Sequence, residues 1–459
     1  MHIAHFVSSD LGTQLFNGIF SAQFLQFIVA FLSFFGFVLT SAVILILVER
    51  KVMGWMQDRV GPIHTGPWGL LQTVADVFKL LMKEDIHASL TDKLVFLVAP
   101  SVFLAPVIAA FAVIPFSPYV GLPGTALATG IVYYVAMSSI DVVGVVMAGW
   151  SSNNKYSLIG GLRGAAQMIS YELPLVLSLV SVIMLTSVIA GTNGYVGSQN
   201  IGSVSVREII DFQNAAAWPG KGIGFFDFIF EGFTPWAWFF LVQPLMIAIY
   251  YVCGLAETNR SPFDLPEAES ELVAGYLTEY SGMRWALFYL GEYGNMTIVS
   301  AIATSLFLGG WSGPGVAYLT GLNSPGWGLL GNLLGIGYFI LKVYLLCVVF
   351  IWVRSTLPRL RADQLMQFAW LILIPTTLGN ILLTGAIYLI LNALGVSNII
   401  FLIVLGVINW LLLFGFVQVV RRATIATTRH AQAPAIRARH LAGTAAQLPE
   451  RTSVAGGGQ

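Results

Sequence analysis

The chain has 459 residues, of which 57% are hydrophobic and only 10% are charged, and its formal net charge at pH 7 is zero. Its mean hydropathy of +0.80 excludes an ordinary soluble domain. The composition predicts an all-α, polytopic membrane protein, with the lipid membrane and no nucleic acid as its surroundings.

Nine apolar stretches are long enough to cross a bilayer as helices. They cover residues 24–47, 94–114, 126–148, 165–189, 236–255, 286–308, 329–353, 369–391 and 399–420. Proline removes a backbone donor from a helix, so Pro100, Pro106, Pro174, Pro244 and Pro375 predict kinks. We expect one membrane domain over residues 1–420 and a disordered tail over 421–459, which has too few apolar residues to fold.

Positive charge falls on alternate loops of this chain. Nineteen of the 22 lysines and arginines would lie on one side of the membrane, which the positive-inside rule makes the inner side. With an odd number of spans, the N-terminus is then outside and the C-terminus inside. Soluble partners are expected on the inner face, because nearly all charged loop residues lie there.

The first inner loop contains an amphipathic segment. Its apolar residues recur at helical spacing and its polar residues form the opposite stripe: Leu70, Val74, Val77, Phe78 and Leu81 against Gln72, Asp76, Lys79 and Lys83. Such a helix lies flat at the membrane interface. The pattern fits two roles equally, an anchor for the loop or a surface that presents Asp76 between basic neighbours.

Seven carboxylates fall between Glu257 and Glu292. Six of them share one inter-span loop with Arg260 and Arg284, so the loop has a formal charge near −4. Asp264, followed three residues later by Glu267, fits a capping box that opens a helix. Capping leaves the other acids unexplained. Close carboxylates in a partly dehydrated site cannot all ionise, so we expect a coupled set that relays protons.

Four ionisable residues fall inside the predicted spans. At a rise of about 1.5 Å per residue, Asp141, Glu172 and Glu292 lie roughly 10–12 Å from an inner helix end. Lys342 lies deeper, at roughly 18 Å. A charge inside the membrane indicates a functional site, and a buried structural ion pair is the alternative.

The sequence offers no electron carrier. Cys253 and Cys347 lie far apart in apolar runs and match no zinc or cluster spacing. None of the six histidines lies in a predicted span, so no histidine pair could hold a haem in the bilayer. We expect no catalytic residue, metal or cofactor in this chain, and electrons must come from another subunit.

Four blocks of sequence carry a resemblance to a known family. They read ERKVMGWMQDRVGP with GLLQTVADVFKLLMKE, GWSSNNKYSLIGGLRGAAQMISYEL, AETNRSPFDLPEAESELVAGYLTEYSGMRWALFYLGEY and WVRSTLPRLRADQLMQFAW. In this order they resemble the membrane protein that is called the H subunit in bacteria and subunit 1 in mitochondria, a part of proton-translocating NADH:quinone oxidoreductase, respiratory complex I. The resemblance covers roughly residues 40–380. The outer loop at 190–235, the ninth span and the arginine-rich tail depart from it, since most members have eight spans.

The resemblance implies roles for three groups of residues. The quinone-binding positions are Arg50, Arg59, Asp76, Lys79, Arg260, Asp264, Trp285, Tyr289 and Arg354, although interfacial aromatics would equally explain Trp285 and Tyr289. A proton relay matches Glu172, Glu257, Glu267, Glu269, Glu271, Glu279 and Glu292, to which we add Asp141 and Lys342 on their intramembrane position alone. We expect Arg359 and Arg361 to dock a soluble partner.

The sequence therefore predicts one component of a translocase in the bacterial plasma (inner) membrane, and this component itself carries no electrons. Quinone is the expected substrate, in a chamber shared with peripheral-arm iron–sulfur subunits on the inner face. Flavin and iron–sulfur clusters are expected in partner subunits, and antiporter-like membrane-arm subunits are expected to move the protons. The alternatives are the equivalent subunit of a membrane-bound hydrogenase or other-donor dehydrogenase, and a self-contained cation transporter.

Overall fold

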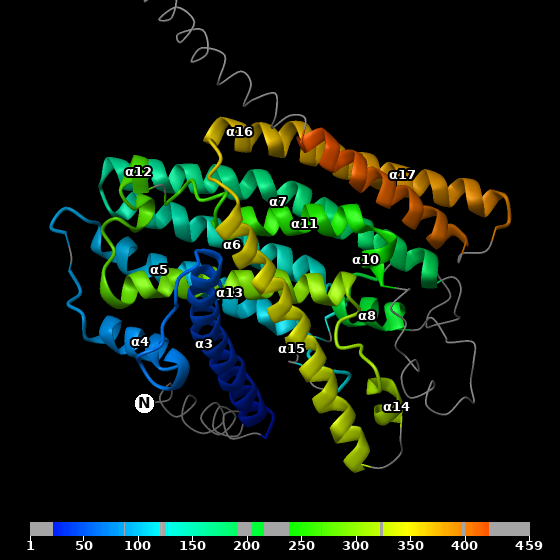
Figure 1. Cartoon of the computed structure of the whole chain (residues 1–459), viewed down its shortest axis with the longest axis horizontal. Coiled ribbons are helices and arrows are strands. Elements are labelled where there is room, and N and C mark those ends of the chain that lie inside the picture. The colour runs from blue at the N-terminus through cyan, green and yellow to red at the C-terminus, as the bar shows by residue number, and fades with distance from the viewer. Residues whose placement is uncertain are drawn as a thin grey trace, which may run out of the picture.

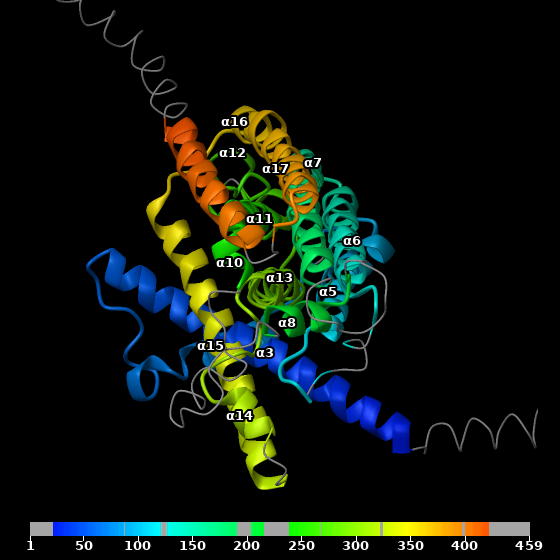
Figure 2. The ribbon, with the colours of Figure 1, turned by 90° about the vertical axis from the view of Figure 1, so that its right-hand side faces the viewer.

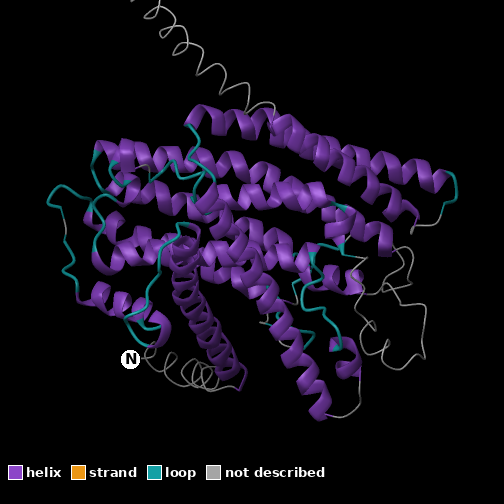
Figure 3. Ribbon diagram, in the orientation of Figure 1, coloured by secondary structure: helices purple, strands orange, loops and turns teal. Residues whose placement is uncertain are grey.

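The computed structural model is built from helices (Figures 1 and 3). It describes residues 22–86, 88–119, 121, 125, 127–190, 203–214, 238–267, 269–321, 325–396 and 400–421. No β-strand occurs among these residues, and the all-α prediction is confirmed. The predictions for the outer loop, apart from residues 203–214, and for the tail beyond residue 421 lie outside the described residues.

Each predicted apolar stretch falls on one helix or on two consecutive helices. They are α3 (Ala22–Met56), α5 (Lys93–Ala110), α6 (Gly130–Ser151), α7 (Lys155–Ala190), α10 (Phe239–Val242) with α11 (Pro244–Glu257), α13 (Gly282–Phe307), α15 (Pro325–Thr356), α16 (Ala362–Gln367) with α17 (Ile374–Ala393), and a last helix, Ile400–Arg421. Among the described residues, six segments are long and apolar enough to cross a membrane: Lys93–Val113, Gly130–Ser151, Lys155–Ser187, Gly326–Thr356, Ala362–Ala393 and Ile400–Arg421. This confirms a polytopic membrane fold, while the count of nine spans and their orientation stay predictions.

Helix α13 lies at the centre of the bundle, where Figure 2 shows it nearly end-on. Every residue from Gly291 to Phe307 is buried. The buried set includes Glu292, Asn295 and Ser300, and this polarity explains why α13 is absent from the six apolar segments. Polar side chains at membrane depth are tolerated where protein covers them, so the centre of the bundle suits this helix.

The fifth predicted span is broken. Helix α10 ends at Val242 and α11 begins at Pro244, with Gln243 between them in a non-helical conformation (φ −132°, ψ 61°). Proline cannot donate to the preceding turn, but its fixed φ suits the first position of a helix. The predicted kink at Pro244 is therefore a full break. In contrast, Pro174 lies inside α7, as Pro100 and Pro106 lie inside α5.

Helix α4 (Gln72–Met82) confirms the predicted amphipathic segment. It packs against α3 and α13. Its apolar side chains, among them Phe78 (60% exposed) and Leu81 (56% exposed), point away from the bundle, as expected for a helix at a membrane interface. The Ile86 backbone N–H donates to Ser281 Oγ at 3.0 Å, which ties the end of this loop to the start of α13.

Short helices complete the described part. They are α8 (Val206–Asn214), α12 (Glu269–Leu272), α14 (Val316–Gly321), the 3-10 helices η1 (Pro67–Gly69), η2 (Phe111–Val113) and η5 (Gly275–Leu277), and a π-helical turn, η6 (Phe368–Leu373), between α16 and α17. Gly275 of η5 has φ +55°, and a Cβ there would lie 1.6 Å from the carbonyl oxygen of Pro266. Only glycine fits this close approach, which folds the acidic loop back on itself.

Candidate functional site

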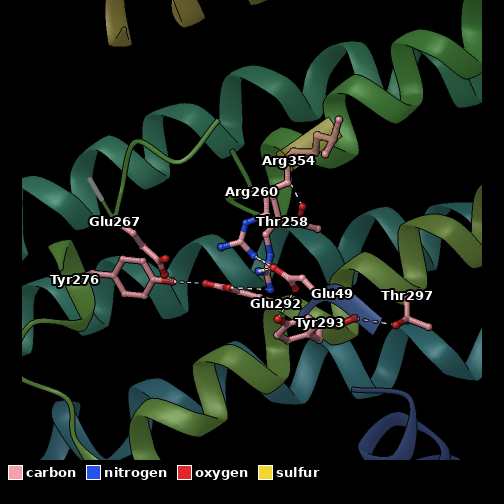
Figure 4. Close-up of polar contacts among 10 residues, drawn as sticks. Glu49, Thr258, Arg260, Glu267, Tyr276, Glu292, Tyr293, Thr297 and Arg354 are labelled. Atoms are coloured by element: carbon pink, nitrogen blue, oxygen red, sulfur yellow. Dashed lines mark hydrogen bonds and ion pairs between the residues drawn. The ribbon is translucent and has the colours of Figure 1, made fainter. Parts of the chain in front are cut away.

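Arg260 lies at the centre of a buried ion-pair network (Figure 4). It follows α11 in the chain and is 5% exposed. Its guanidinium lies 3.7 Å from Glu49 Oε1 and 3.5 Å from Glu292 Oε2, and its Cζ lies 4.3 Å from the centroid of the Tyr293 ring. Burial disfavours its charge, but Tyr293, Glu49 and Glu292 raise the pKa of Arg260 above its ordinary value. A fixed cation thus joins α3, α11 and α13.

Glu49, near the inner end of α3, binds a second arginine. Arg354, in the last turn of α15, forms an ion pair with Glu49 Oε1. The Tyr293 hydroxyl donates to Glu49 Oε2 at 2.6 Å. Both oxygens of this carboxylate therefore have donors, which is the condition for keeping an ionised group buried.

Tyr276, in η5, connects the acidic loop to this network. Its hydroxyl lies 3.4 Å from Glu267 Oε1 and 3.3 Å from Glu292 Oε1 (Figure 4). A phenol has one proton, so it cannot donate to both carboxylates at once. Burial and the neighbouring Glu292 raise the pKa of Glu267 well above its ordinary value. A proton held on Glu267 makes the cluster charge-balanced, with two arginines facing two ionised glutamates.

The predicted capping box at Asp264 is wrong, because no helix begins there and the next helix, α12, starts at Glu269. Asp264 instead accepts a hydrogen bond from Arg359 at 2.6 Å. Burial raises the pKa of Asp264, and the hydrogen bond from Arg359 opposes that shift. Glu267 turns inward because its partners, Tyr276 and Glu292, lie in the core. The helical spacing of the two acids was therefore coincidental.

A second polar group lies where α3 meets α4. Arg50 NH1 lies 2.5 Å from Asp76 Oδ2, and Gln72 Nε2 donates to Asp76 Oδ1 at 3.3 Å. Arg59 is exposed and bonds to Gln57 at 2.7 Å, and Lys79 is exposed on α4. The structure thus brings Arg50 and Asp76 together, and it leaves Arg59 and Lys79 outside this contact.

Trp285 and Tyr289 lie on the first two turns of α13, with ring centroids 4.1 Å apart. Both rings are partly buried. The nearest turn of α4 reaches the same place, since a Cβ on Gly282 would lie 3.4 Å from the carbonyl oxygen of Lys83. The aromatic pair and the Arg50–Asp76 pair therefore border the same inner corner of the molecule, between α3, α4 and α13.

The intramembrane acids form a third group, on α6, α7 and α11. Asp141 Oδ2 accepts a hydrogen bond from Asn295 at 2.6 Å, and Asn295 is three residues after Glu292 on α13. Glu172 accepts a hydrogen bond from the Ser139 hydroxyl. Glu257, 9% exposed, has Glu172 and Ser138 as electrostatic neighbours. The expectation that Asp141, Glu172 and Glu292 share one level agrees with these contacts.

Three other predicted residues lie at the surface. Glu271 is 60% exposed at its side chain and pairs with Arg163 at 2.6 Å. Glu279 accepts from Asn154 at 2.9 Å. Arg361 is exposed at the start of α16, where its backbone N–H donates to Gln364 Oε1 at 3.4 Å. The side chain of Glu269 lies outside the described residues.

Lys342 lies apart from all of these acids. Its ammonium donates to the carbonyl oxygens of Leu308 at 2.8 Å, Gly310 at 3.0 Å and Ser312 at 2.8 Å, and Nζ lies 4.3 Å from the Trp238 ring centroid. All three N–H donors are used, at the C-terminal end of α13 where a cation complements the helix dipole. This geometry favours a structural helix cap over a proton carrier.

Sequence reasoning missed Glu49, Tyr276 and Tyr293. Glu49 opens the ERK triplet directly after the first apolar stretch, and an acid next to two cations was the available signal. Tyr276 and Tyr293 look like any of the 16 tyrosines, because nothing local marks which hydroxyl reaches a distant carboxylate.

The fold and the site define a class of protein: a multi-pass helical membrane protein with a buried, titratable charge network. A family model described as NADH dehydrogenase matches residues 28–385. The chain is 46% identical over 351 residues to the NADH-quinone oxidoreductase H subunit of Dehalococcoides mccartyi, covering 76% of this chain and 84% of that one. It is 41% identical over 395 residues to the first NADH-quinone oxidoreductase H subunit of Geobacter sulfurreducens, covering 82% and 99%. The chain belongs to the NADH dehydrogenase family, and the resemblance seen in the sequence is confirmed.

Proposed function

We propose that this chain is the H subunit of an NADH-quinone oxidoreductase in the bacterial inner membrane, that it binds quinone, and that it couples quinone reduction to proton translocation. Peripheral-arm subunits with flavin and iron–sulfur clusters would supply the electrons, and antiporter-like subunits would move the protons. Family membership and the names of the relatives support the assembly.

The quinone headgroup is expected at the inner corner bordered by Arg50, Asp76, Trp285 and Tyr289. Polar groups there could orient the headgroup, and aromatic surfaces could pack against its ring. Helix α4 adds an exposed apolar face beside this corner, which suits an isoprenoid tail arriving from the membrane. Asp264 and Arg359 lie on the same inner side, where a soluble partner would dock.

One observation carries the coupling proposal: carboxyl groups extend in steps from the acidic loop into the membrane helices. Glu267 and Glu292 share the Tyr276 hydroxyl, Asn295 bridges from α13 to Asp141, and Glu172 and Glu257 lie beyond it on neighbouring helices.

Reduction of a quinone to a quinol takes up two electrons and two protons, so it changes the charge beside this series. Arg260 is the fixed cation against which a proton on the Glu267–Glu292 pair can move. We therefore assign the relay to Glu267, Glu292, Asp141, Glu257 and Glu172.

Glu292→Gln tests this assignment, because glutamine keeps the shape and removes the titratable proton. We expect NADH:quinone reduction and proton pumping to fall together by at least about tenfold, while electron transfer to an artificial acceptor at the flavin is unchanged. Glu208→Gln, on the outer helix α8 where Glu208 accepts from Ser203 at 2.5 Å, is the matched control and should behave as wild type. Wild-type quinone reduction and pumping by assembled Glu292→Gln enzyme would reject the relay.

A further inference from the structure

A second buried polar cluster lies away from the charged network, where the last helix joins the bundle. Its members, here called the amide cluster, are Gln243, Asn380 and Asn409, with the hydroxyl of Ser181 beside them. Gln243 and Asn409 are 0% exposed and Asn380 is 2% exposed. They come from the α10–α11 break, from α17 and from the last helix.

Side-chain contacts place these residues at one level of the bundle. The Ser181 hydroxyl donates to Gln243 Oε1 at 2.9 Å. Helix α17 and the last helix form an antiparallel pair whose Tyr388 and Phe401 rings are 5.7 Å apart (Figure 1). Asn380 precedes Tyr388 by eight residues and Asn409 follows Phe401 by eight, so the two asparagines lie opposite each other.

The last helix also has a fixed register against the broken span. The rings of Phe240 and Trp410 are 6.1 Å apart, and a Cβ on Gly406 would lie 3.3 Å from the carbonyl oxygen of Leu241. Asn409 lies between Gly406 and Trp410 in the sequence, and it is buried, so it faces the break at Gln243.

Helix α17 is aligned with α7 in the same way. Trp370 Nε1 donates to Ser170 Oγ at 3.3 Å, and a Cβ on Gly385 would lie 3.5 Å from the Cε of Met184. Asn380 falls between these two contact points, at the height of Ser181. The side chains of four helical segments therefore converge on one place.

Four atoms of the amide cluster have no hydrogen-bond partner among the described residues. They are Gln243 Nε2, Asn380 Nδ2, Asn380 Oδ1 and Asn409 Oδ1, two donors and two acceptors. Exchanging the oxygen and nitrogen of Asn380 leaves one of each at that residue. A metal cation needs acceptors only and an anion needs donors only, whereas water satisfies both kinds of group. Buried polar groups of this kind are typically bridged by ordered water with two to four partners.

We propose that Gln243, Asn380 and Asn409 bind ordered water between α7, the α10–α11 break, α17 and the last helix. The last helix completes the site by supplying Asn409, and it lies beyond residue 385, where the family match ends. A water bridge would hold this helix to the bundle by polar contacts, in a setting where lipid supplies no hydrophobic drive for helix association.

Electron cryo-microscopy of the intact enzyme, at a resolution that shows water, tests the proposal directly. We expect density within hydrogen-bond distance of both side-chain atoms of Asn380 and of Asn409 or Gln243. Direct amide-to-amide hydrogen bonds with no density between them would overturn it.

A double-mutant cycle gives an independent readout in the melting temperature of the intact enzyme. Asn380→Leu and Asn409→Leu should each lower it, and the double variant should lower it by less than the sum, because removing one amide leaves the others unpaired. Additive shifts would overturn the proposal. If a leucine variant does not assemble, Asn380→Ala and Asn409→Ala complete the same cycle.

Thr384→Val is the matched control for this cycle. Thr384 is 2% exposed on the same face of α17, and its hydroxyl is already bonded to the Asn380 carbonyl at 2.8 Å within its own helix. Combined with Asn409→Leu, it should give additive shifts.

Discussion

The charged network around Arg260 and the amide cluster around Asn380 are both buried between helices, yet they satisfy their polar groups in different ways. In the network, Glu49 and Glu292 each face a cation and a tyrosine hydroxyl. In the amide cluster, neutral groups converge and leave donors and acceptors without protein partners among the described residues.

This difference follows from the free energy of desolvation. Burying an unpaired ion costs several kcal/mol, about twice or more the 1–3 kcal/mol for a neutral amide without a partner. Charged groups therefore need fixed counter-ions from the protein, while neutral amides can be served by water. Only the charged network can change its protonation state, so only this region suits a relay.

Arg260→Leu should have the largest effect, since it removes the cation shared by Glu49 and Glu292. Breaking a buried pair by removing one partner costs about 3–5 kcal/mol. We expect little assembled enzyme, measured as the amount of intact complex in membranes on a native gel. Arg260→Lys, which keeps the charge, should recover part of that amount. Normal assembly of Arg260→Leu enzyme would mean that the network is not needed to hold the helices.

Lys342→Met should have an intermediate effect confined to stability. The change removes three hydrogen bonds at the end of α13, and leaving buried carbonyls without donors costs about 1–3 kcal/mol. The melting temperature should fall, while the ratio of quinone reduction to artificial-acceptor reduction stays at the wild-type value. A selective fall in quinone reduction by assembled enzyme would return Lys342 to the relay.

The sequence was sufficient to predict the elements of this fold but not their partners. Apolar run length located the helical segments, and the spacing of Val74, Phe78 and Leu81 located α4 before any contact was known. The break at Gln243 was foreseen only as a kink, because proline marks a weak point without saying whether the chain continues as one helix.

The site was predicted in part, since acids and arginines at span ends are visible in a sequence. Pairing is not visible. Glu49 and Arg354 are 305 positions apart, and Asp264 and Arg359 are 95 apart. Local spacing even misled, because Asp264 and Glu267 fit a capping box while tertiary contacts hold them in other roles.

The pH dependence of stability should reveal the proton on Glu267. Its folded-state pKa is raised, so the folded enzyme keeps a proton that the unfolded chain releases near about pH 4.3. The folded state binds more protons between these two pKa values, so stability falls as pH rises through that window. Glu267→Gln should flatten the fall, measured as melting temperature against pH. An unchanged slope in the variant would assign the proton elsewhere.

Glu271→Gln should have the smallest effect, although Glu271 belongs to the same acidic loop as Glu267. Its side chain is 60% exposed and its partner Arg163 is 34% exposed. Exposed ion pairs contribute about 0–1 kcal/mol and are screened by salt. We expect quinone reduction and pumping close to wild type at physiological salt, with any loss shrinking as salt is raised. A loss as large as that of Glu292→Gln, and insensitive to salt, would mean that this surface becomes buried against a partner protein and that the series of acids begins there.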